Sequence, residues 1–243
     1  WFFSGILITA RKGTGQPRVI AIPPVVKLAQ PPLNSATRAP LRRLGIQDQD
    51  HVYLFTYCGK VYTETLWRYT MAERGLQDLM DAAALLREVS GLKILVSMPM
   101  LAQPETREML KGHLEQRGVG HLFVLTHELD NLDEVLRAVD AYLYPIDLDE
   151  VSWAPLSVLE AFACGTPVIT TRVPAVLQFV DDGEALLYEP GQAEELAGLM
   201  WRLFSEPGLA AQLRERARRK VELFDCRGKA AEETLQALSQ FTR

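Results

Sequence analysis

The feature that most constrains the fold is a regular alternation of strand-like and helix-like segments over residues 51–171. Short apolar runs rich in β-branched residues alternate with segments whose apolar residues recur at helical spacing. The strand-like runs are HVYLFTYC, KILVSM, HLFVL, AYLYP and TPVITT, and the helical segments are 73–89, 104–116, LDEVLRAV and PLSVLEAFA. This alternation predicts βαβ units, and hence an α/β fold with a doubly wound, mainly parallel sheet and helices on both faces, as in Rossmann-like domains.

The segments on either side of this alternation set the expected domain boundaries. Residues 1–22 hold two strand-like runs, FFSGILIT and RVIAIP, which we expect to be edge strands or the remnant of an N-terminal domain. Residues 23–45 are rich in proline and without periodicity, which predicts a linker or loop. The Rossmann-like domain is expected over 46–224, with the turn DDGEALLYEP and helices at 192–204 and 208–224, followed by a C-terminal helix within 225–243. The chain begins with Trp, so we expect further residues upstream.

The composition excludes several classes of protein. Of 243 residues, 48% are hydrophobic and 23% charged, as in ordinary globular proteins. The net charge of −5 argues against a nucleic-acid binder, and the basic run 214–220 is interpreted as a solvated helix face. Three widely spaced cysteines, Cys58, Cys164 and Cys226, favour neither a disulfide framework nor a zinc site, and they fit a reducing compartment such as the cytoplasm. The opening WFFSGILITA is too short to cross a bilayer.

Two basic residues follow the first strand of the predicted sheet. Ligands of doubly wound sheets bind outside the carboxyl ends of the strands, where Gly59-Lys60 and Arg74-Gly75 are expected. A glycine permits close backbone approach, and lysine and arginine side chains suit a diphosphate. Taken by themselves, Lys60 and Arg74 are better explained as surface cations than as ligands of a diphosphate.

The helix that begins at Pro155 offers a second anion site. Its first N–H groups, at Leu156, Ser157 and Val158, are free to bind phosphate, and Ser157 adds a hydroxyl. Glu160 lies one turn further along, where a carboxylate can accept two hydroxyl hydrogen bonds from a ribose. The alternative is that Glu160 only supplies the polar side of an amphipathic helix.

The stretch LSVLEAFACGTPVITT resembles the signature of the retaining glycosyltransferase family called glycosyl transferases group 1. Members have two Rossmann-like domains, an arrangement called GT-B, and bind the sugar donor in the C-terminal one. IPP at 22–24, Gly59-Lys60 followed by ERGLQDLMDAAALL, and DDGEALLYEPGQAEELA also resemble family segments, in the same order. The similarity covers about residue 18 to the end. It implies that Lys60 and Arg74 bind and stabilise the leaving diphosphate and that Glu160 binds the ribose. It also implies that the loop His127-Glu128-Leu129 lies against the base.

One segment departs from the family pattern. Where members have E-G-F-G followed by four residues and a Glu, this chain has Ser152-Trp153-Ala154-Pro155 before Glu160. The carboxylate that contacts the transferred sugar in the family is therefore replaced by Ser152. Asp147, Asp149 or Glu150 could supply a carboxylate from a rebuilt loop, and we take Glu150 and Ser152 as the candidates for sugar contacts.

The first functional hypothesis is a retaining glycosyltransferase of hexosyltransferase type, acting in carbohydrate biosynthesis on a UDP- or GDP-linked sugar. No cofactor or metal is expected, and this chain would be mostly the donor-binding half. An N-terminal domain or a partner chain would bind the acceptor, a glycan, lipid-linked molecule or protein, with contact at the membrane surface if the acceptor is lipid-linked. The alternative is a degenerate, non-catalytic binding or scaffolding module. A nucleotide-sugar epimerase is less favoured, and a nicotinamide oxidoreductase least, because no G-x-G-x-x-G follows the first strand.

Overall fold

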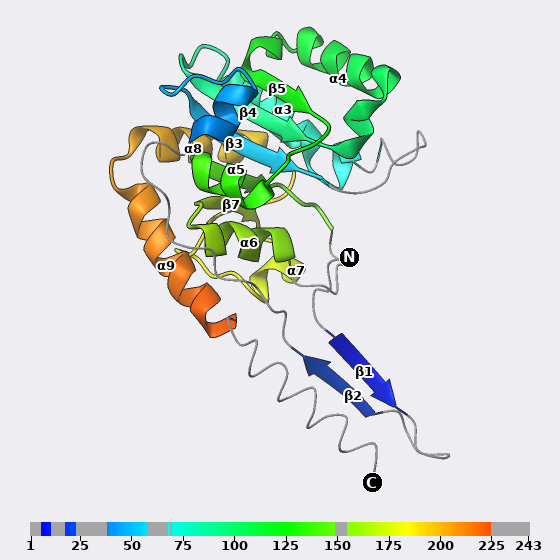
Figure 1. Cartoon of the computed structure of the whole chain (residues 1–243), viewed down its shortest axis with the longest axis vertical. Helices are drawn as coiled ribbons and strands as arrows, with labels where there is room; N and C mark the ends of the chain where they lie inside the picture. The colour runs from blue at the N-terminus through cyan, green and yellow to red at the C-terminus, as the bar shows by residue number, and fades with distance from the viewer. Residues whose placement is uncertain are drawn as a thin grey trace.

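The computed structural model describes residues 6–10, 18–22, 38–57, 68, 70–148 and 155–224 (Figure 1). Its centre is a parallel sheet of six strands, in the order β5-β4-β3-β6-β7-β8. The strands are β3 (His51–Thr56), β4 (Leu92–Ser97), β5 (Phe123–Thr126), β6 (Ala141–Tyr144), β7 (Val168–Thr171) and β8 (Leu186–Tyr188). The chain builds outward from β3 to β5 and then returns to add β6, β7 and β8 on the other side, which is the order of the dinucleotide-binding Rossmann fold. The predicted fold class is confirmed.

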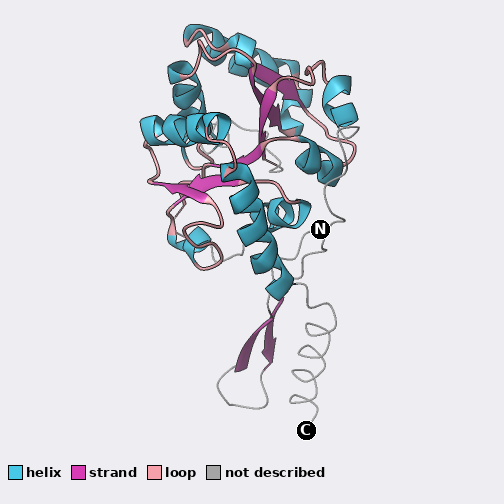
Figure 2. Cartoon of the chain, turned by 90° about the vertical axis from the view of Figure 1, so that its left-hand side faces the viewer, coloured by secondary structure: helices cyan, strands magenta, loops and turns pink. Residues whose placement is uncertain are grey.

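Helices cover both faces of this sheet (Figure 2). The first core lies under α3 (Leu76–Leu85), α4 (Pro104–Gln116) and α8 (Ala193–Ser205). The second core lies under α1 (Ala39–Arg43), α5 (Leu132–Ala138), α6 (Leu156–Cys164) and α7 (Pro174–Leu177). Helix α9 (Leu209–Phe224) contributes to both cores, with Leu213 in the first and Ala217 and Val221 in the second. Short 3₁₀ turns, η2 (Pro99–Ala102) and η3 (Gly120–Leu122), complete the described elements of the domain.

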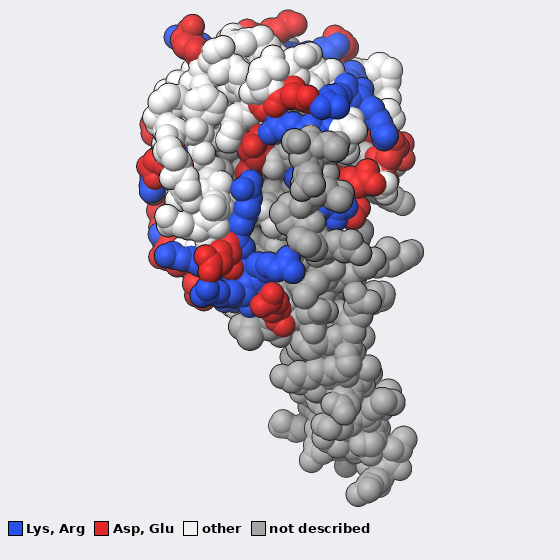
Figure 3. Space-filling view, turned by 60° about the vertical axis from the view of Figure 1, so that its left-hand side comes forward, with Lys and Arg blue, Asp and Glu red and all other residues white. Residues whose placement is uncertain are grey.

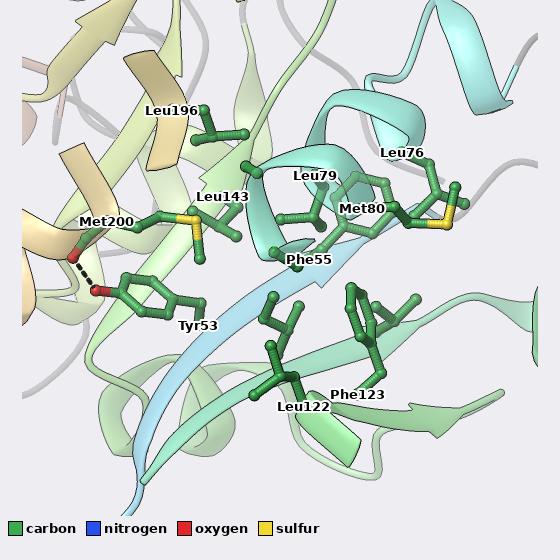
Figure 4. Close-up of a cluster of buried hydrophobic side chains, with 14 of the residues drawn as sticks. Tyr53, Phe55, Leu76, Leu79, Met80, Leu122, Phe123, Leu143, Leu196 and Met200 are labelled. Atoms are coloured by element: carbon green, nitrogen blue, oxygen red, sulfur yellow. Dashed lines mark hydrogen bonds between the residues drawn. The ribbon is translucent and has the colours of Figure 1, made fainter. Parts of the chain in front are cut away.

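The alternation of side chains along β3 explains why both faces are buried. Tyr53 and Phe55 enter the first core, whereas Val52 and Leu54 enter the second. The buried Tyr53 hydroxyl donates to the Met200 carbonyl oxygen of α8 at 2.5 Å, so its polar end is satisfied inside the core (Figure 4). This bond ties α8, a helix from the end of the domain, to the first strand of the sheet.

The expected start of the domain at residue 46 is wrong. Helix α1 lies within the stretch predicted to be a linker, and its Leu41 is fully buried in the second core. Arg38 donates to the Asp140 carboxylate at 2.8 Å and to the Asp50 carbonyl oxygen at 2.5 Å. The domain therefore includes residues 38–45, and proline at the first turn of a short helix accounts for the weak periodicity there. Residues 23–37 lie outside the described residues.

The turn expected at DDGEALLYEP contains the sixth strand. Leu186–Tyr188 pairs in parallel with Ile169–Thr171, and three residues are too few for a sequence pattern to separate a strand from a turn. The two runs within 1–22 do form strands, β1 (Ile6–Ala10) and β2 (Arg18–Ile22), which pair antiparallel as a separate two-stranded sheet. Their origin as a domain remnant stays a prediction, and the C-terminal helix expected within 225–243 lies outside the described residues.

None of the helices described is both long and apolar enough to cross a lipid bilayer.

Candidate functional site

The candidate site lies where the connections of the sheet diverge. Strands β3 and β6 are hydrogen-bonded neighbours. The chain leaves β3 toward α3 on the first core and leaves β6 toward α6 on the second. Connections that diverge from adjacent parallel strands open a crevice at their carboxyl ends, the usual ligand site of such sheets. We call this crevice, between the carboxyl ends of β3 and β6, the switch point. The turn before α3, the loop after β6 and the start of α6 meet this end of the sheet.

The turn that carries Arg74 is docked on the loop after β6. Gly75 has a left-handed backbone (φ 68°), and a Cβ on it would lie 1.7 Å from the Pro145 carbonyl oxygen. The Asp147 N–H donates to the Glu73 carbonyl oxygen at 2.8 Å. Only glycine permits both this backbone conformation and this approach. The structure therefore places the turn that carries Arg74 at this crevice, and the role of Arg74 at a diphosphate stays a prediction.

The Arg74 guanidinium lies over the ring of Tyr57, with Cζ 5.1 Å from the ring centroid. Both residues line a cavity of about 20 Å³ with Thr56, Tyr144 and Ile146, which come from the carboxyl ends of β3 and β6. A space of this size holds about one water molecule. It marks the point where the described loops converge.

Threonine hydroxyls hold the loop after β6 in place, and sequence reasoning missed them. The buried Thr171 Oγ1, at the end of β7, donates to the Ile146 carbonyl oxygen at 2.5 Å. Thr170 Oγ1 donates to the Tyr144 carbonyl oxygen at 2.8 Å. Both hydroxyls donate to backbone carbonyl oxygens at or just after the end of β6, where the regular hydrogen bonding between strands stops. The signal was the pair of threonines at the carboxyl end of the predicted strand TPVITT.

The start of α6 provides fewer free amides than expected. The Val158 N–H donates to the Pro155 carbonyl oxygen at 2.9 Å, so this group is already used. The N–H groups of Leu156 and Ser157 have no acceptor among the described residues. This is the ordinary condition of a first helical turn, and it leaves two donors at the helix N-terminus. The prediction for the Val158 amide is corrected, and its side chain is wholly buried in the second core.

Glu160 is a partly buried carboxylate on a helix that is otherwise almost entirely apolar. The residues around it on α6, Val158, Leu159, Ala161 and Phe162, are all buried. Burial raises the pKa of Glu160 above its usual value. Within the described part of the chain no hydrogen bond or ion pair satisfies this carboxylate, although Ser157 lies one turn away on the same face. A carboxylate that is desolvated without a protein partner is suited to accept hydrogen bonds from a ligand.

The loop after β5 lies at the same end of the sheet but further from the switch point. His127 and Glu128 are exposed, and Leu129 is partly buried against the second core. The Thr126 hydroxyl donates to the Glu128 carbonyl oxygen at 2.8 Å and fixes the turn. Strand β4 separates β5 from β3, so the loop lies about 10 Å from β3 across the sheet. Contacts of His127 and Leu129 with a base remain a prediction.

Comparisons with known proteins decide the family. A model of the glycosyl transferases group 1 matches residues 70–220, more than half of the chain. The chain belongs to this family.

Individual relatives agree with the family match. The D-inositol 3-phosphate glycosyltransferase of Acidothermus cellulolyticus is 29% identical over 204 residues, which are 83% of this chain and 43% of that protein. The protein of the same name from Rhodococcus jostii is 38% identical over 96 residues, 39% of this chain and 21% of that protein.

Solved structures agree with the fold. HepE from Anabaena, in complex with UDP and glucose, superposes with a TM-score of 0.72 at 16% identity, covering 90% of this chain and 56% of that one. Sucrose-phosphate synthase from Thermosynechococcus elongatus superposes with a TM-score of 0.69 at 20% identity, covering 91% and 52%. The chain spans about half the length, or less, of all these relatives.

Several residues that the family resemblance singled out lie outside the described residues. These are Gly59, Lys60, Glu150 and Ser152, together with Asp149. Their roles at the diphosphate and the sugar stay predictions. In the described ranges, no group of three or more His, Cys, Asp or Glu side chains is arranged to hold a metal ion.

Proposed function

We propose that this chain is the donor-binding half of a retaining glycosyltransferase and binds a UDP- or GDP-linked sugar at the switch point. The observation that carries the proposal is the Glu160 carboxylate, which is partly buried, without a partner among the described residues and close to two free helix amides. On an apolar helix such a partly desolvated group gains hydrogen bonds when a ligand with hydroxyl groups binds.

The arrangement accounts for both parts of a nucleotide. Glu160 accepts hydrogen bonds from the two ribose hydroxyls, as acidic residues of dinucleotide folds do. The Leu156 and Ser157 amides lie three to four residues earlier, about 5 Å along the helix axis, toward its positive end. That offset suits a phosphate attached to the same ribose. Arg74 approaches from the other side of the crevice, with Lys60 as the second predicted cation.

The proposed reaction places developing negative charge where these groups are. The bond between the anomeric carbon and the diphosphate oxygen breaks, the acceptor hydroxyl oxygen bonds to that carbon on the same face, and the hydroxyl proton passes to the departing diphosphate. Arg74, Lys60 and the α6 amides stabilise the departing charge without a metal ion or cofactor. The acceptor, a glycan, lipid-linked molecule or protein, is bound by an N-terminal domain or partner chain. We place the reaction in the cytoplasm, at the membrane surface if the acceptor is lipid-linked.

Calorimetric titration with UDP and GDP tests the proposal. UDP is the first choice because the HepE structure contains it. We expect saturable binding of one nucleotide and at least about tenfold weaker binding by Glu160→Gln, since hydrogen bonds to a charged acceptor contribute roughly 1.5–3 kcal/mol. Glu115→Gln, at an exposed glutamate in the last turn of α4, removes the same charge at the opposite end of the sheet and should bind as the wild type does. Equal affinity in wild type and Glu160→Gln would overturn the assignment.

The sequence segment Ser152-Trp153-Ala154-Pro155 favours a second candidate, a degenerate module that binds without catalysis. It lacks the carboxylate that contacts the sugar in the family and both of its glycines. A folded chain that binds neither UDP nor GDP would support this candidate. A chain that binds nucleotide and transfers sugar, once joined to its acceptor-binding part, would exclude it.

A further inference from the structure

A second cavity lies at the edge of the sheet, away from the switch point. It has a volume of about 220 Å³ and lies between β8, α8 and α9. Strand β8 forms one edge of the sheet, and β7 separates it from β6. The cavity is lined by Asp182 and Gly183, which precede β8, and by residues of β8, α8 and α9, and none of the residues that line the crevice at β3 and β6 belongs to it. It is therefore distinct from the crevice at the carboxyl ends of β3 and β6.

The cavity combines an apolar wall with arginine side chains. Leu186, Leu199 and Leu213 form the wall. Arg172, the residue after β7, lines the cavity with Arg202 of α8 and Arg216 of α9. Asp182 is the single carboxylate in this lining, so three positive charges meet one negative charge. The whole chain has a net charge of −5, and the cavity therefore differs in sign from the protein around it. Such a lining favours an anion.

Two of the three arginines are neutralised by neighbouring carboxylates. Arg172 makes two hydrogen bonds to Asp182, at 2.7 and 3.1 Å. Arg202 makes two hydrogen bonds to Glu206, at 2.8 and 3.3 Å. The positive charge that remains belongs to Arg216.

Arg216 lies against an acidic turn whose carboxylates are already taken. In the turn 181–184, Asp181 and Glu184 both pair with Lys220, at 2.9 and 3.2 Å, and Asp182 pairs with Arg172. Arg216 has no ion-pair partner among the described residues. The Arg216 Nη1 lies only 2.4 Å from the point that a Cβ would occupy if residue 183 had a side chain, and the φ of Gly183 is +98°. The absent side chain at Gly183 thus lets this guanidinium lie on the turn beside the cavity.

The remaining charges of α9 show that Arg216 is unlike its neighbours. Arg219 pairs with Glu215, and Arg218 with Glu222. Arg214 donates to the Gly165 carbonyl oxygen at 3.1 Å. On the face shown in Figure 3, Lys and Arg side chains lie beside Asp and Glu side chains in the same way. The basic run is therefore mostly an internally paired surface, as its interpretation as a solvated face suggested.

We propose that this cavity binds a small molecule that carries a phosphate group, with the phosphate on Arg216 and Arg172 and a less polar part against the leucine wall. Arginine binds phosphate oxygens through parallel hydrogen bonds, and an anion with two charges can recruit Arg172 even though Asp182 holds it. The inference does not depend on the donor site.

The test uses inorganic phosphate and phenyl phosphate as probes, titrated into the whole chain at low ionic strength. We expect saturable binding of both, with phenyl phosphate tighter because its ring buries against the leucines. Arg216→Gln should weaken binding at least about fivefold. Arg219→Gln makes the same change on the same helix outside the cavity and should alter affinity less than about twofold.

Two further variants make the outcome specific to the cavity. Gln212→Glu adds a carboxylate at an exposed lining residue and should abolish phosphate binding. Arg216→Gln in an Arg74→Gln background, which weakens the crevice at the carboxyl ends as a competing phosphate site, should cause the same fold-loss of probe binding as Arg216→Gln alone. The proposal is overturned by no saturable binding to the folded wild-type chain, by equal losses in Arg216→Gln and Arg219→Gln, or by equal affinities for the two probes.

Discussion

Gly75 and Pro145 are in direct contact across the switch point: a Cβ on Gly75 would lie 1.7 Å from the Pro145 carbonyl oxygen. This contact joins the turn before α3 to the loop after β6, and so it fixes the position of Arg74. The hydrogen bond from the Asp147 N–H to the Glu73 carbonyl oxygen closes the same junction. The proposed diphosphate site therefore depends on a backbone contact as much as on its cations.

Gly75→Ala should be destabilising beyond the cost of its backbone conformation. Gly118 offers a matched control, because its φ of +67° equals that of Gly75 within a degree and nothing lies within 4 Å of a Cβ there. Gly118→Ala should cost about 1 kcal/mol of unfolding free energy through backbone strain alone. Gly75→Ala should cost roughly 2–4 kcal/mol, since the Pro145 loop must also move. Urea denaturation measures both, and equal losses would contradict the contact.

Thr171→Val should loosen the loop after β6. The substitution keeps the side-chain shape but leaves the buried Ile146 carbonyl oxygen without its hydroxyl donor, at a cost of about 1–3 kcal/mol. Thr171→Ser retains the hydroxyl and should recover most of the stability. We also expect Thr171→Val to weaken UDP binding, because Ile146 precedes the residue whose amide holds the Arg74 turn. Valine and serine variants of equal stability would show that the hydrogen bond contributes nothing.

Leu41→Ala tests whether the domain starts before residue 46. Leu41 is fully buried in the second core, and truncating a buried leucine costs about 2–5 kcal/mol. Leu85→Ala is the control, because that leucine is 58% exposed and its truncation should change stability by less than about 0.5 kcal/mol. Thermal or urea unfolding compares the two. A Leu41→Ala protein as stable as the wild type would restore the original boundary.

His51 should make the protein less stable in mild acid. Burial lowers the pKa of His51 below its usual value. The Asp140 carboxylate, whose oxygen lies 3.8 Å from Nδ1, raises this pKa, but its effect is smaller than that of burial. The positive charges of Arg38 and Arg214 lower the pKa further. The unfolded chain therefore binds a proton more readily than the folded one. Stability is full above pH 6.5, the usual value, and falls as the pH drops toward the lowered pKa.

His51→Phe keeps the ring packing with Tyr53 and Phe204 and removes the titrating group. Urea denaturation between pH 5 and 7.5 should show a shallower pH dependence in this variant than in the wild type. His51 Nε2 is buried with no hydrogen-bond partner in the described part of the chain, so the phenylalanine should be tolerated at neutral pH. An unchanged slope would show that His51 does not titrate differently in the two states.

The sequence predicted what depends on local pattern and missed what depends on contacts between distant segments. The helix at 104–116 and the strands β3 to β7 follow from periodicity, whereas the roles of Arg74, Leu156, Ser157 and Glu160 at a ligand stay predictions. Strand β8 and helix α1 were missed because three to five residues show no period. The bond from Thr171 to Ile146 joins residues 25 apart in the chain, and no local pattern reports it.

UDP binding should weaken in acid through Glu160. Burial raises the pKa of this carboxyl above its usual 4.5, so its charged form, which accepts ribose hydroxyls best, is lost at a higher pH than for an exposed glutamate. The β-phosphate of UDP also gains a proton as the pH falls, and the two effects must be separated. Glu160→Gln provides the separation, because it retains only the effect of the phosphate.

We expect the ratio of wild-type to Glu160→Gln affinity to fall toward one as the pH is lowered from 7 to about 4.5. Calorimetric titration across that range measures the ratio, with Glu115→Gln following the wild type. A ratio that stays constant would mean that the Glu160 charge does not contact the nucleotide.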